Sequence, residues 1–250
     1  MSELVIVALF IGFIWLLARM YRSYMIRQTK FKLGIAQILS DGTVVETMDH
    51  QIEADSTLPF EGRLLALFFA TYLIMREQKD AGNWTGLISA YLFKWEMAGL
   101  ITSEHFDESV TRFTFHDGKK PIDAIEIELY DILKSNLESG FDFDLLQDWS
   151  QKVLAMGEKE LLETSDVAFD AKGRIRFTSA GYDRSLSHGR FAKYWRSLSA
   201  ATVCEKDETR LFQELSVALL LNLTEEIESF AIKRDEVSEM LLIANRVWRF

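Results

Sequence analysis

The sequence predicts a mainly α-helical fold with small β-hairpins (α+β), in which an N-terminal transmembrane helix precedes one or two winged-helix-like units and a C-terminal helical segment. Three observations predict it: an uncharged apolar run at the start, helical patterns over most of the remainder, and two places where a pair of helices precedes two short alternating segments. Because 48% of the 250 residues are hydrophobic, the chain is able to bury a sizeable core.

The transmembrane prediction rests on residues 4–18, which carry no charge and no helix breaker other than Gly12. As a helix this run rises about 22 Å, against about 30 Å of hydrocarbon, so the flanking residues have to complete the span at the interface. The predicted anchor consists of apolar side chains and one flanking cation: Leu4, Ile6, Leu9, Ile11, Phe13, Trp15, Leu17 and Arg19.

A group of cations sets the orientation of this predicted span. Arg19, Arg22, Arg27, Lys30 and Lys32 follow the run without an acidic residue among them, and no side-chain cation precedes it. The positive-inside rule then predicts a single-pass protein of the inner (cell) membrane whose C-terminal domain is cytoplasmic. A cleaved signal peptide and a buried core helix are the two alternatives, and the missing basic start and cleavage site argue against the first.

Charge and cysteine content narrow the classes of function. The chain has 28 Lys/Arg and 38 Asp/Glu; residues 1–32 hold five of the former and one of the latter, so 23 basic and 37 acidic residues remain in the domain. A net charge of −14 repels nucleic acid and anionic lipid unless the charges are segregated. The single Cys204 suits a reducing compartment and excludes an internal disulfide.

We divide the chain into an anchor with its basic juxtamembrane segment (1–32), a first winged-helix-like unit with an N-terminal connector (33–122), and a second unit with the C-terminal helices (123–250). The expected elements of the first unit are a connector with a hairpin turn at Asp41-Gly42, helices over 61–77 and 84–98, and alternating segments over 100–106 and 111–116. Its apolar stretch 64–75 is too short to cross a bilayer, so we expect it at the centre of the core.

The same order is expected again in the second unit, with helices over 125–137 and 143–162, a hairpin over 167–177, a helix capped by Thr178 or Ser179 and interrupted at His188-Gly189, and helices over 190–199, 208–223 and from Thr224. Whether this is a second winged-helix-like unit or a helical extension of the first stays open. The amphipathic segment 237–250, with exposed-looking Val247, Trp248 and Phe250, either packs back on the domain or docks a partner.

Four segments in this order carry a resemblance to a known family: LFKWEMAGLI, LYDILKS, RFTSAGYDRSLSHGRFAKYWRSL and LFQELSVALLLNLTEEI. Over residues 60–230 the chain resembles the cytoplasmic C-terminal region of the YciQ-like bacterial membrane proteins, a family without an assigned activity. The resemblance brings no catalytic residues and implies a LemA-like membrane protein as partner. Longer members of the family resemble a chain with an extracytoplasmic β-rich domain, then membrane spans, and then this region. In the present chain a short anchor leads directly into the region.

Motifs for catalysis, metal binding and phosphate binding are missing from the sequence. Its four histidines are scattered and are expected in loops or on the surface, and no HExxH, CxxC or glycine-rich phosphate loop occurs. We therefore expect no enzyme, cofactor or metal. DNA binding is not expected either, because the helix in the recognition position, 84–98, offers only Lys94, next to the acidic Glu96.

One segment, 172–196, is rich in cations and aromatic rings and is named here the basic-aromatic segment. Its candidate interaction residues are Lys172, Arg174, Arg176, Arg184, Arg190, Lys193, Tyr194, Trp195 and Arg196. Such a surface suits anionic lipid, RNA or an acidic partner. The alternative is that the cations neutralise the acidic remainder of the domain while Phe191, Tyr194 and Trp195 pack inward.

These observations lead to two hypotheses about function. The first is a non-catalytic, single-pass protein whose cytoplasmic winged-helix-like domain is an interaction module in a membrane assembly. The second is a membrane-tethered regulator that binds anionic lipid or nucleic acid through the basic-aromatic segment.

Overall fold

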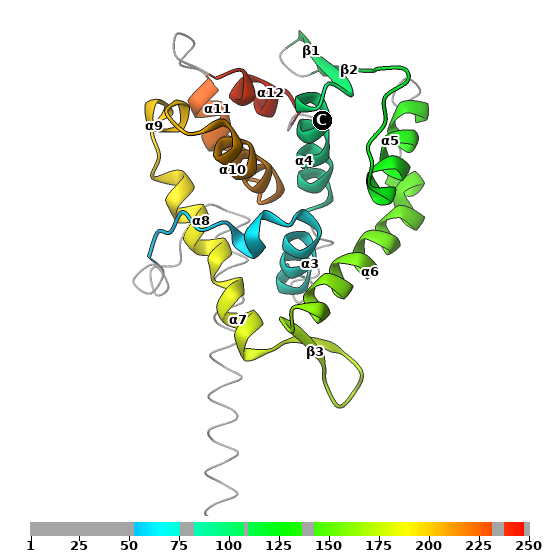
Figure 1. The fold of residues 1–250 in the computed structure, drawn as a ribbon, viewed down its shortest axis with the longest axis vertical. Coiled ribbons are helices and arrows are strands. Elements are labelled where there is room, and N and C mark those ends of the chain that lie inside the picture. The colour runs from blue at the N-terminus through cyan, green and yellow to red at the C-terminus, as the bar shows by residue number, and fades with distance from the viewer. Residues whose placement is uncertain (1–52, 76–82, 108–109, 137–142, 232–237, 248–250) are drawn as a thin grey trace, which may run out of the picture.

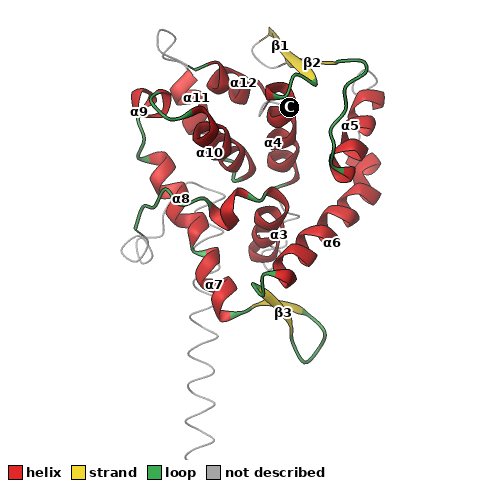
Figure 2. Cartoon of the chain, in the orientation of Figure 1, coloured by secondary structure: helices red, strands yellow, loops and turns green. Residues whose placement is uncertain are grey.

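The fold is mainly helical with two small antiparallel sheets, as the sequence predicted, and it was obtained as a computed structural model (Figures 1 and 2). The structure describes residues 53–75, 83–107, 110–136, 143–231 and 238–247. The predicted anchor, Leu4 to Arg19, and the hairpin expected at Asp41-Gly42 lie outside these residues. Among the residues that are described, no helix combines the length and the apolar character that crossing a membrane requires.

The helices and strands follow one another in an order that twice places a two-stranded hairpin after a pair of helices. The first group comprises η1 (Pro59–Gly62), α3 (Leu64–Met75), α4 (Trp84–Met97), β1 (Ile101–Asp107) and β2 (Val110–Phe115). The second comprises α5 (Ala124–Asn136), η4 (Phe143–Leu146), α6 (Gln147–Glu163), β3 (Val167–Phe169) and β4 (Ile175–Phe177). The described residues after β4 form six helices: α7 (Ser179–Ser185), α8 (Ser187–Arg196), α9 (Ala200–Cys204), α10 (Glu208–Leu220), α11 (Thr224–Ala231) and α12 (Glu239–Val247).

The core is built around α3 and α4, which lie at the centre of the molecule in Figure 1. Helix α3 packs against α6, and α4 packs against α10 and α12. Rings join these layers: Trp84 lies 4.5 Å from Phe68 and 5.9 Å from Trp149, measured between ring centroids. The prediction that 64–75 forms a core helix is confirmed, because its apolar side chains are buried on nearly every side.

Local capping chemistry explains several of the helix ends. The Asn83 side chain accepts a hydrogen bond from the Gly86 N–H at the start of α4, and Gly99 has the positive φ (65°) common just after a helix. Thr178 caps α7 by accepting from Gly181 N–H, as predicted. Asp207 caps α10 through the amides of its first turn. These boundaries follow from the sequence because each depends on residues only a few positions away.

The two predicted hairpins that fall within the described residues are present and antiparallel. In the first, Ile101 pairs with Phe115; in the second, Val167 pairs with Phe177. The turn of the second is fixed by Asp170, whose carboxylate accepts from the amides of residues 172 and 174. The hydrogen bond from the Arg174 amide is the main reason that the pKa of Asp170 falls to about 2.

Three expectations about the C-terminal half were wrong, and one helix was missed. His188, expected in a loop or on the surface, is fully buried inside α8, where its Nδ1–H donates to the Ser185 carbonyl left free at the end of α7. The helix break therefore falls at Leu186, before His188-Gly189. Val247, expected to be exposed, is fully buried because α12 packs on α4, α11 and β1. Helix α9 was not predicted at all.

The predicted boundary between residues 122 and 123 does not divide the hydrophobic core. One cluster of buried residues includes Leu87 and Phe93 of α4, Trp149 of α6 and Leu215 of α10. The pairs α3–α6 and α4–α10 carry this cluster across the boundary. The described residues therefore pack as one body.

Candidate functional site

The basic-aromatic segment extends over the β3–β4 turn, α7 and α8, and two of its aromatic residues, Phe191 and Trp195, are buried. Trp195 has no exposed surface and stacks on Phe191, with 6.0 Å between the ring centroids. Trp195 therefore does not belong to an interaction surface, which corrects its place among the candidate residues. It turns inward because helical spacing puts positions 191 and 195 on the face of α8 that meets the core.

Most cations of the segment are held by carboxylates of the same chain. Arg174 and Arg176 lie 2.9 and 3.7 Å from Asp170, and Arg184 lies 3.1 Å from the fully buried Asp166. Arg196 lies 2.9 Å from Glu226 of α11, and Lys193 also interacts within the chain. Neutralisation inside the domain thus accounts for much of the positive charge.

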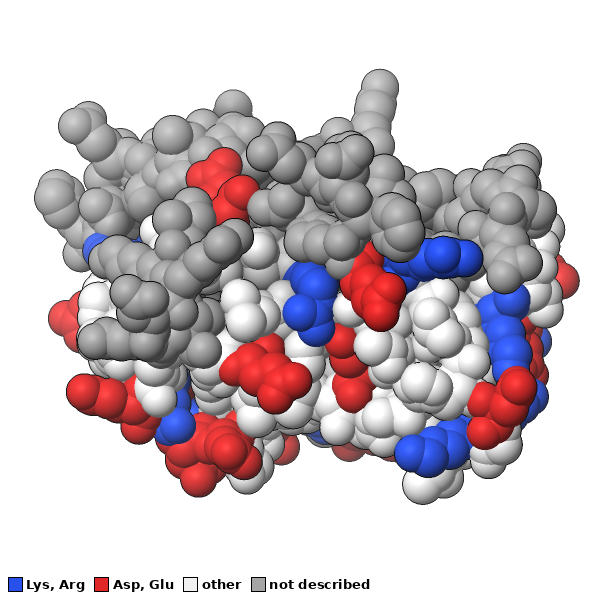
Figure 3. Space-filling view, turned by 90° about the horizontal axis from the view of Figure 1, so that it is seen from above, with Lys and Arg blue, Asp and Glu red and all other residues white. Residues whose placement is uncertain are grey.

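Lys172 at the hairpin turn and Arg190 on α8 are exposed, as is Arg174, which pairs with Asp170. Figure 3 draws the upper end of the molecule, opposite α7 and the β3–β4 hairpin, and there basic and acidic side chains are interleaved among uncharged ones. For the basic-aromatic segment itself, the ion pairs of Arg174, Arg184 and Arg196 disfavour strong binding to a polyanion, since such binding needs several cations acting together.

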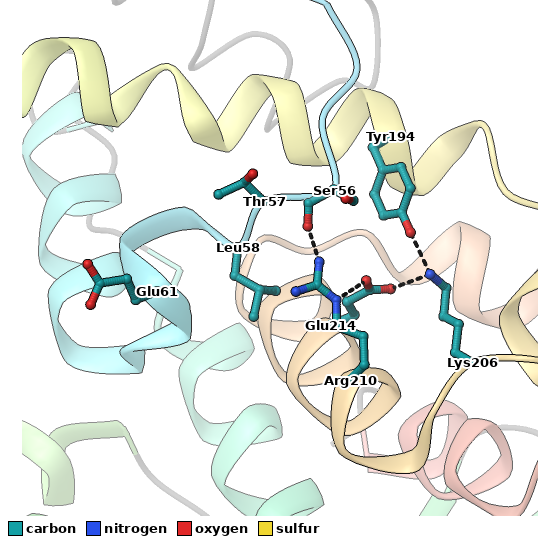
Figure 4. A pocket seen from close by; sticks show the side chains of 8 residues that line it. All are labelled: Ser56, Thr57, Leu58, Glu61, Tyr194, Lys206, Arg210 and Glu214. Atoms are coloured by element: carbon teal, nitrogen blue, oxygen red, sulfur yellow. Dashed lines mark hydrogen bonds and ion pairs between the residues drawn. The ribbon is translucent and has the colours of Figure 1, made fainter.

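A cleft of about 540 Å³ lies beside this segment, between the N-terminal residues of the described chain, α8 and α10 (Figure 4). Its lining residues come from three parts of the sequence: Ser56, Thr57, Leu58, Glu61, Tyr194, Lys206, Arg210 and Glu214. The wall formed by residues 56–58 is held in place from both sides. The Asp55 N–H donates to the Arg190 carbonyl (3.2 Å), and the Arg210 guanidinium donates to the Ser56 carbonyl.

The cleft contains a buried carboxylate with two cations. Glu214 has no exposed side-chain surface, and its oxygens lie 2.6 Å from Arg210 Nε and 3.1 Å from Lys206 Nζ. Lys206 Nζ also donates to the Tyr194 hydroxyl (2.5 Å) and lies 5.0 Å from the centroid of that ring. Burial lowers the pKa of Lys206, but the hydrogen bond to Tyr194 and the contact with Glu214 outweigh it, and the net shift is upward. Lys206 is therefore a permanent cation.

Other buried carboxylates bridge elements of the fold. Glu126 of α5 accepts from Lys94 (2.5 Å) and from the Trp95 indole (3.0 Å), both of α4. Glu96 of α4 accepts from Ser103 of β1 (2.5 Å) and from Arg246 of α12 (2.9 Å). These groups are structural, because each joins two elements and has its charge satisfied. Within the part of the chain that the structure describes, no cluster of His, Cys, Asp or Glu side chains could hold a metal ion.

Sequence reasoning missed the cleft entirely. Its one visible signal was Glu214, a carboxylate on the apolar face of the helix predicted over 208–223, with Arg210 four residues before it. A charge in such a position implies a buried partner.

Comparison with known proteins found no match. No protein-family model, curated protein or solved structure matches this chain.

Proposed function

We propose that this chain is a non-catalytic, single-pass protein of the inner membrane, whose cytoplasmic domain is an interaction module in a membrane assembly. The uncharged run 4–18 and the cations that follow it support the anchor and its orientation. The charged groups of the described core support a non-catalytic role, because they join helices to one another. A LemA-like membrane protein is the partner that the family resemblance implies.

We also propose that the domain consists of winged-helix-like units. The order of α3, α4 and the β1–β2 hairpin supports the first unit, and the order of α5, α6 and the β3–β4 hairpin supports a second. The shared core makes the two units parts of one body, so we regard the second as an integral extension of the first.

The observation that carries the proposal is the burial of α4, the helix in the recognition position. Residues 86–93 and Trp95 are all buried, and α4 packs against α10, α12 and β1. A recognition helix must present its side chains to the major groove, which a central core helix cannot do. The fold therefore favours contacts with proteins over the reading of DNA.

Exposed apolar side chains give this proposal its contact points. The Ile122 side chain, just before α5, is 99% exposed, and Phe169 on β3 is 58% exposed. Single exposed apolar residues are common on protein surfaces, but a fully exposed isoleucine gains free energy when a partner covers it.

The second function considered, binding of anionic lipid or nucleic acid through the basic-aromatic segment, has weaker support. Its favourable observation is the exposure of Lys172 and Arg190. Against it stand the ion pairs that engage Arg174, Arg184 and Arg196.

Site-specific photocrosslinking in native membranes tests the proposal. A photoreactive phenylalanine analogue replaces Ile122 or Phe169 in the full-length chain, and matched probes replace the exposed polar residues Lys119 and Lys159. We expect a discrete crosslinked membrane protein from the apolar positions, weaker crosslinks from the lysine positions, and loss of the product when residues 1–32 are removed. Crosslinks to lipid alone, or equal products at all four positions, would contradict an interaction module with these contacts.

A further inference from the structure

The cleft beside α8 and α10 has features of a binding site that the proposed function does not use. Its volume of about 540 Å³ lies within the range of pockets for small molecules, roughly 300–1,000 Å³. Residues far apart in the sequence form it: backbone of residues 56–58, the Tyr194 ring, and the side chains of Lys206 and Arg210. Its lining residues are mostly polar, and Leu58 and the Tyr194 ring supply the apolar part.

The two cations of the cleft share one buried carboxylate. Lys206 and Arg210 both pair with Glu214, so these three residues together carry a formal charge of +1. Glu61, which stands apart from this cluster in Figure 4, brings the formal charge of the lining to zero, and the Asp55 carboxylate also acts on Arg210. An anion would therefore meet positive charge at the end of the cleft that Lys206 and Arg210 form.

The surroundings strengthen that charge. The Lys206 side chain is only 14% exposed, so water screens it weakly, and Tyr194 and Glu214 fix the position of its ammonium group. Arg210 is 37% exposed. A guanidinium suits the planar oxygens of a carboxylate or the tetrahedral oxygens of a phosphate.

We propose that this cleft binds a small organic anion through Lys206 and Arg210, with a carboxylate or phosphate group as the recognised chemistry. Tyr194 and Leu58 contact the uncharged part of the ligand. Glu214 has a positioning role: it holds both cations at the floor of the cleft and reduces their combined charge from +2 to +1.

Substitutions of Lys206 and Glu214 should change the affinity for anions in opposite directions. Lys206→Gln reduces the formal charge of the Lys206, Arg210 and Glu214 cluster to zero and should weaken anion binding about tenfold. Glu214→Gln raises that charge to +2 and should strengthen binding about fivefold. The double substitution restores +1 and should restore affinity close to that of the wild type. Lys159→Gln, at an exposed position on α6, is the matched control and should have no effect.

The experiment is isothermal titration calorimetry of the full chain in detergent micelles. The probes are inorganic phosphate and acetate up to about 20 mM, at constant ionic strength, with glycerol as the neutral comparison. Saturable binding of phosphate alone, acetate alone or both, in the stated order of variants, supports the proposal and identifies the recognised group. The absence of saturable binding to both anions overturns it, as do equal affinities of the wild type, Lys206→Gln and Glu214→Gln.

Circular dichroism spectra of the wild type and its four variants show whether each protein is folded. If one of the single variants is poorly folded, the double variant still tests whether a restored charge restores the affinity. Because the photocrosslinking test uses Ile122 and Phe169, away from the cleft lining, failure of either proposal is recognised independently of the other.

Discussion

Gly181 shows how a single residue determines local packing. A Cβ atom at this position of α7 would overlap the backbone carbonyl of Asp166. The close approach allows Thr178 N–H to donate to the Asp166 carbonyl (2.9 Å) and Arg184 to contact its carboxylate (3.1 Å). Glycine at this position therefore joins α7 to the start of the β3–β4 hairpin.

Gly181→Ala should lower the free energy of unfolding by about 2 kcal/mol, since relief of the overlap requires the backbone of α7 or residue 166 to move. Urea denaturation measures the change. Asp183→Ala, at an exposed position of the same helix, is the control and should shift the midpoint little. A Gly181→Ala protein as stable as this control would show that the approach is not tight.

His188 is the second residue whose setting the fold decides. Burial lowers the pKa of its ring to about 4, from an ordinary value near 6.5, and the nearby Ser185 and Leu67 backbone groups only partly oppose this. The Phe60 ring lies edge-on at 5.5 Å between centroids. The ring is therefore neutral in the folded protein at neutral pH.

This setting predicts a pH dependence of stability. Between pH 6.5 and 4 the unfolded chain binds a proton at His188 that the folded chain does not, so stability present above pH 6.5 is lost as the pH falls toward 4, by about 3 kcal/mol. His188→Gln should lack this loss, measured by urea denaturation across that range. Glu160, whose pKa burial raises, acts in the opposite direction but cancels in the comparison. His116→Gln is the control, and a His188→Gln profile parallel to the wild type would refute the prediction.

At the scale of elements, α12 is held by one polar network and one apolar face. Arg246 contacts Glu96 of α4 and the Ser103 hydroxyl of β1, both at 2.9 Å, and Ser89 donates to the Val247 carbonyl (3.2 Å). The Glu96 side chain is nearly buried, so its charge depends on Arg246. The C-terminal segment thus packs back on the domain as far as Val247.

Arg246→Met should detach α12 because it leaves the Glu96 carboxylate buried without its cation, at a cost of about 3 kcal/mol. Hydrogen exchange over residues 239–247 should rise, while exchange in α6 stays unchanged. Glu96→Gln combined with Arg246→Met removes both charges and should recover part of the protection. If hydrogen exchange over residues 239–247 is unchanged in Arg246→Met, the apolar face of α12 alone holds this helix on the domain.

At the scale of the whole molecule, the shared core has a consequence for folding. Helix α3 of the first unit packs on α6 of the second, and α4 packs on α10, so either unit alone would expose the faces that these pairs bury. Exposed apolar helix faces cost far more free energy than a small unit has available.

Residues 33–122 and 123–250 expressed separately should therefore fail to fold, and the full domain should unfold in a single transition. Near-ultraviolet circular dichroism, which reports on packed Trp84 and Trp149, provides the measurement. Restored signal on mixing the fragments would strengthen this interpretation. A cooperative unfolding transition of either fragment alone would instead make that unit an independent domain.

The sequence by itself determined most of the described helices, the two described hairpins and several caps of this protein. Thr178, Gly99 and the turn at Asp170 act on amides a few residues away, and the apolar run 64–75 has only one environment that suits it, so these features are readable from local order. The same local reasoning misplaced His188 and Val247, since a helix with mixed composition has several faces and only packing selects the buried one.

The tertiary structure alone decided the polar contacts between distant elements and where a cleft forms. Arg210 meets the Ser56 carbonyl, 154 residues earlier, and Lys206, in the loop before α10, meets Tyr194 of α8. No periodicity relates such positions, because contacts between elements depend on how their faces pack and not on spacing along the chain. Trp195 is buried for the same reason: the positions of α11 and η1 against α8, not the composition of residues 172–196, determined which side of that helix faces the core.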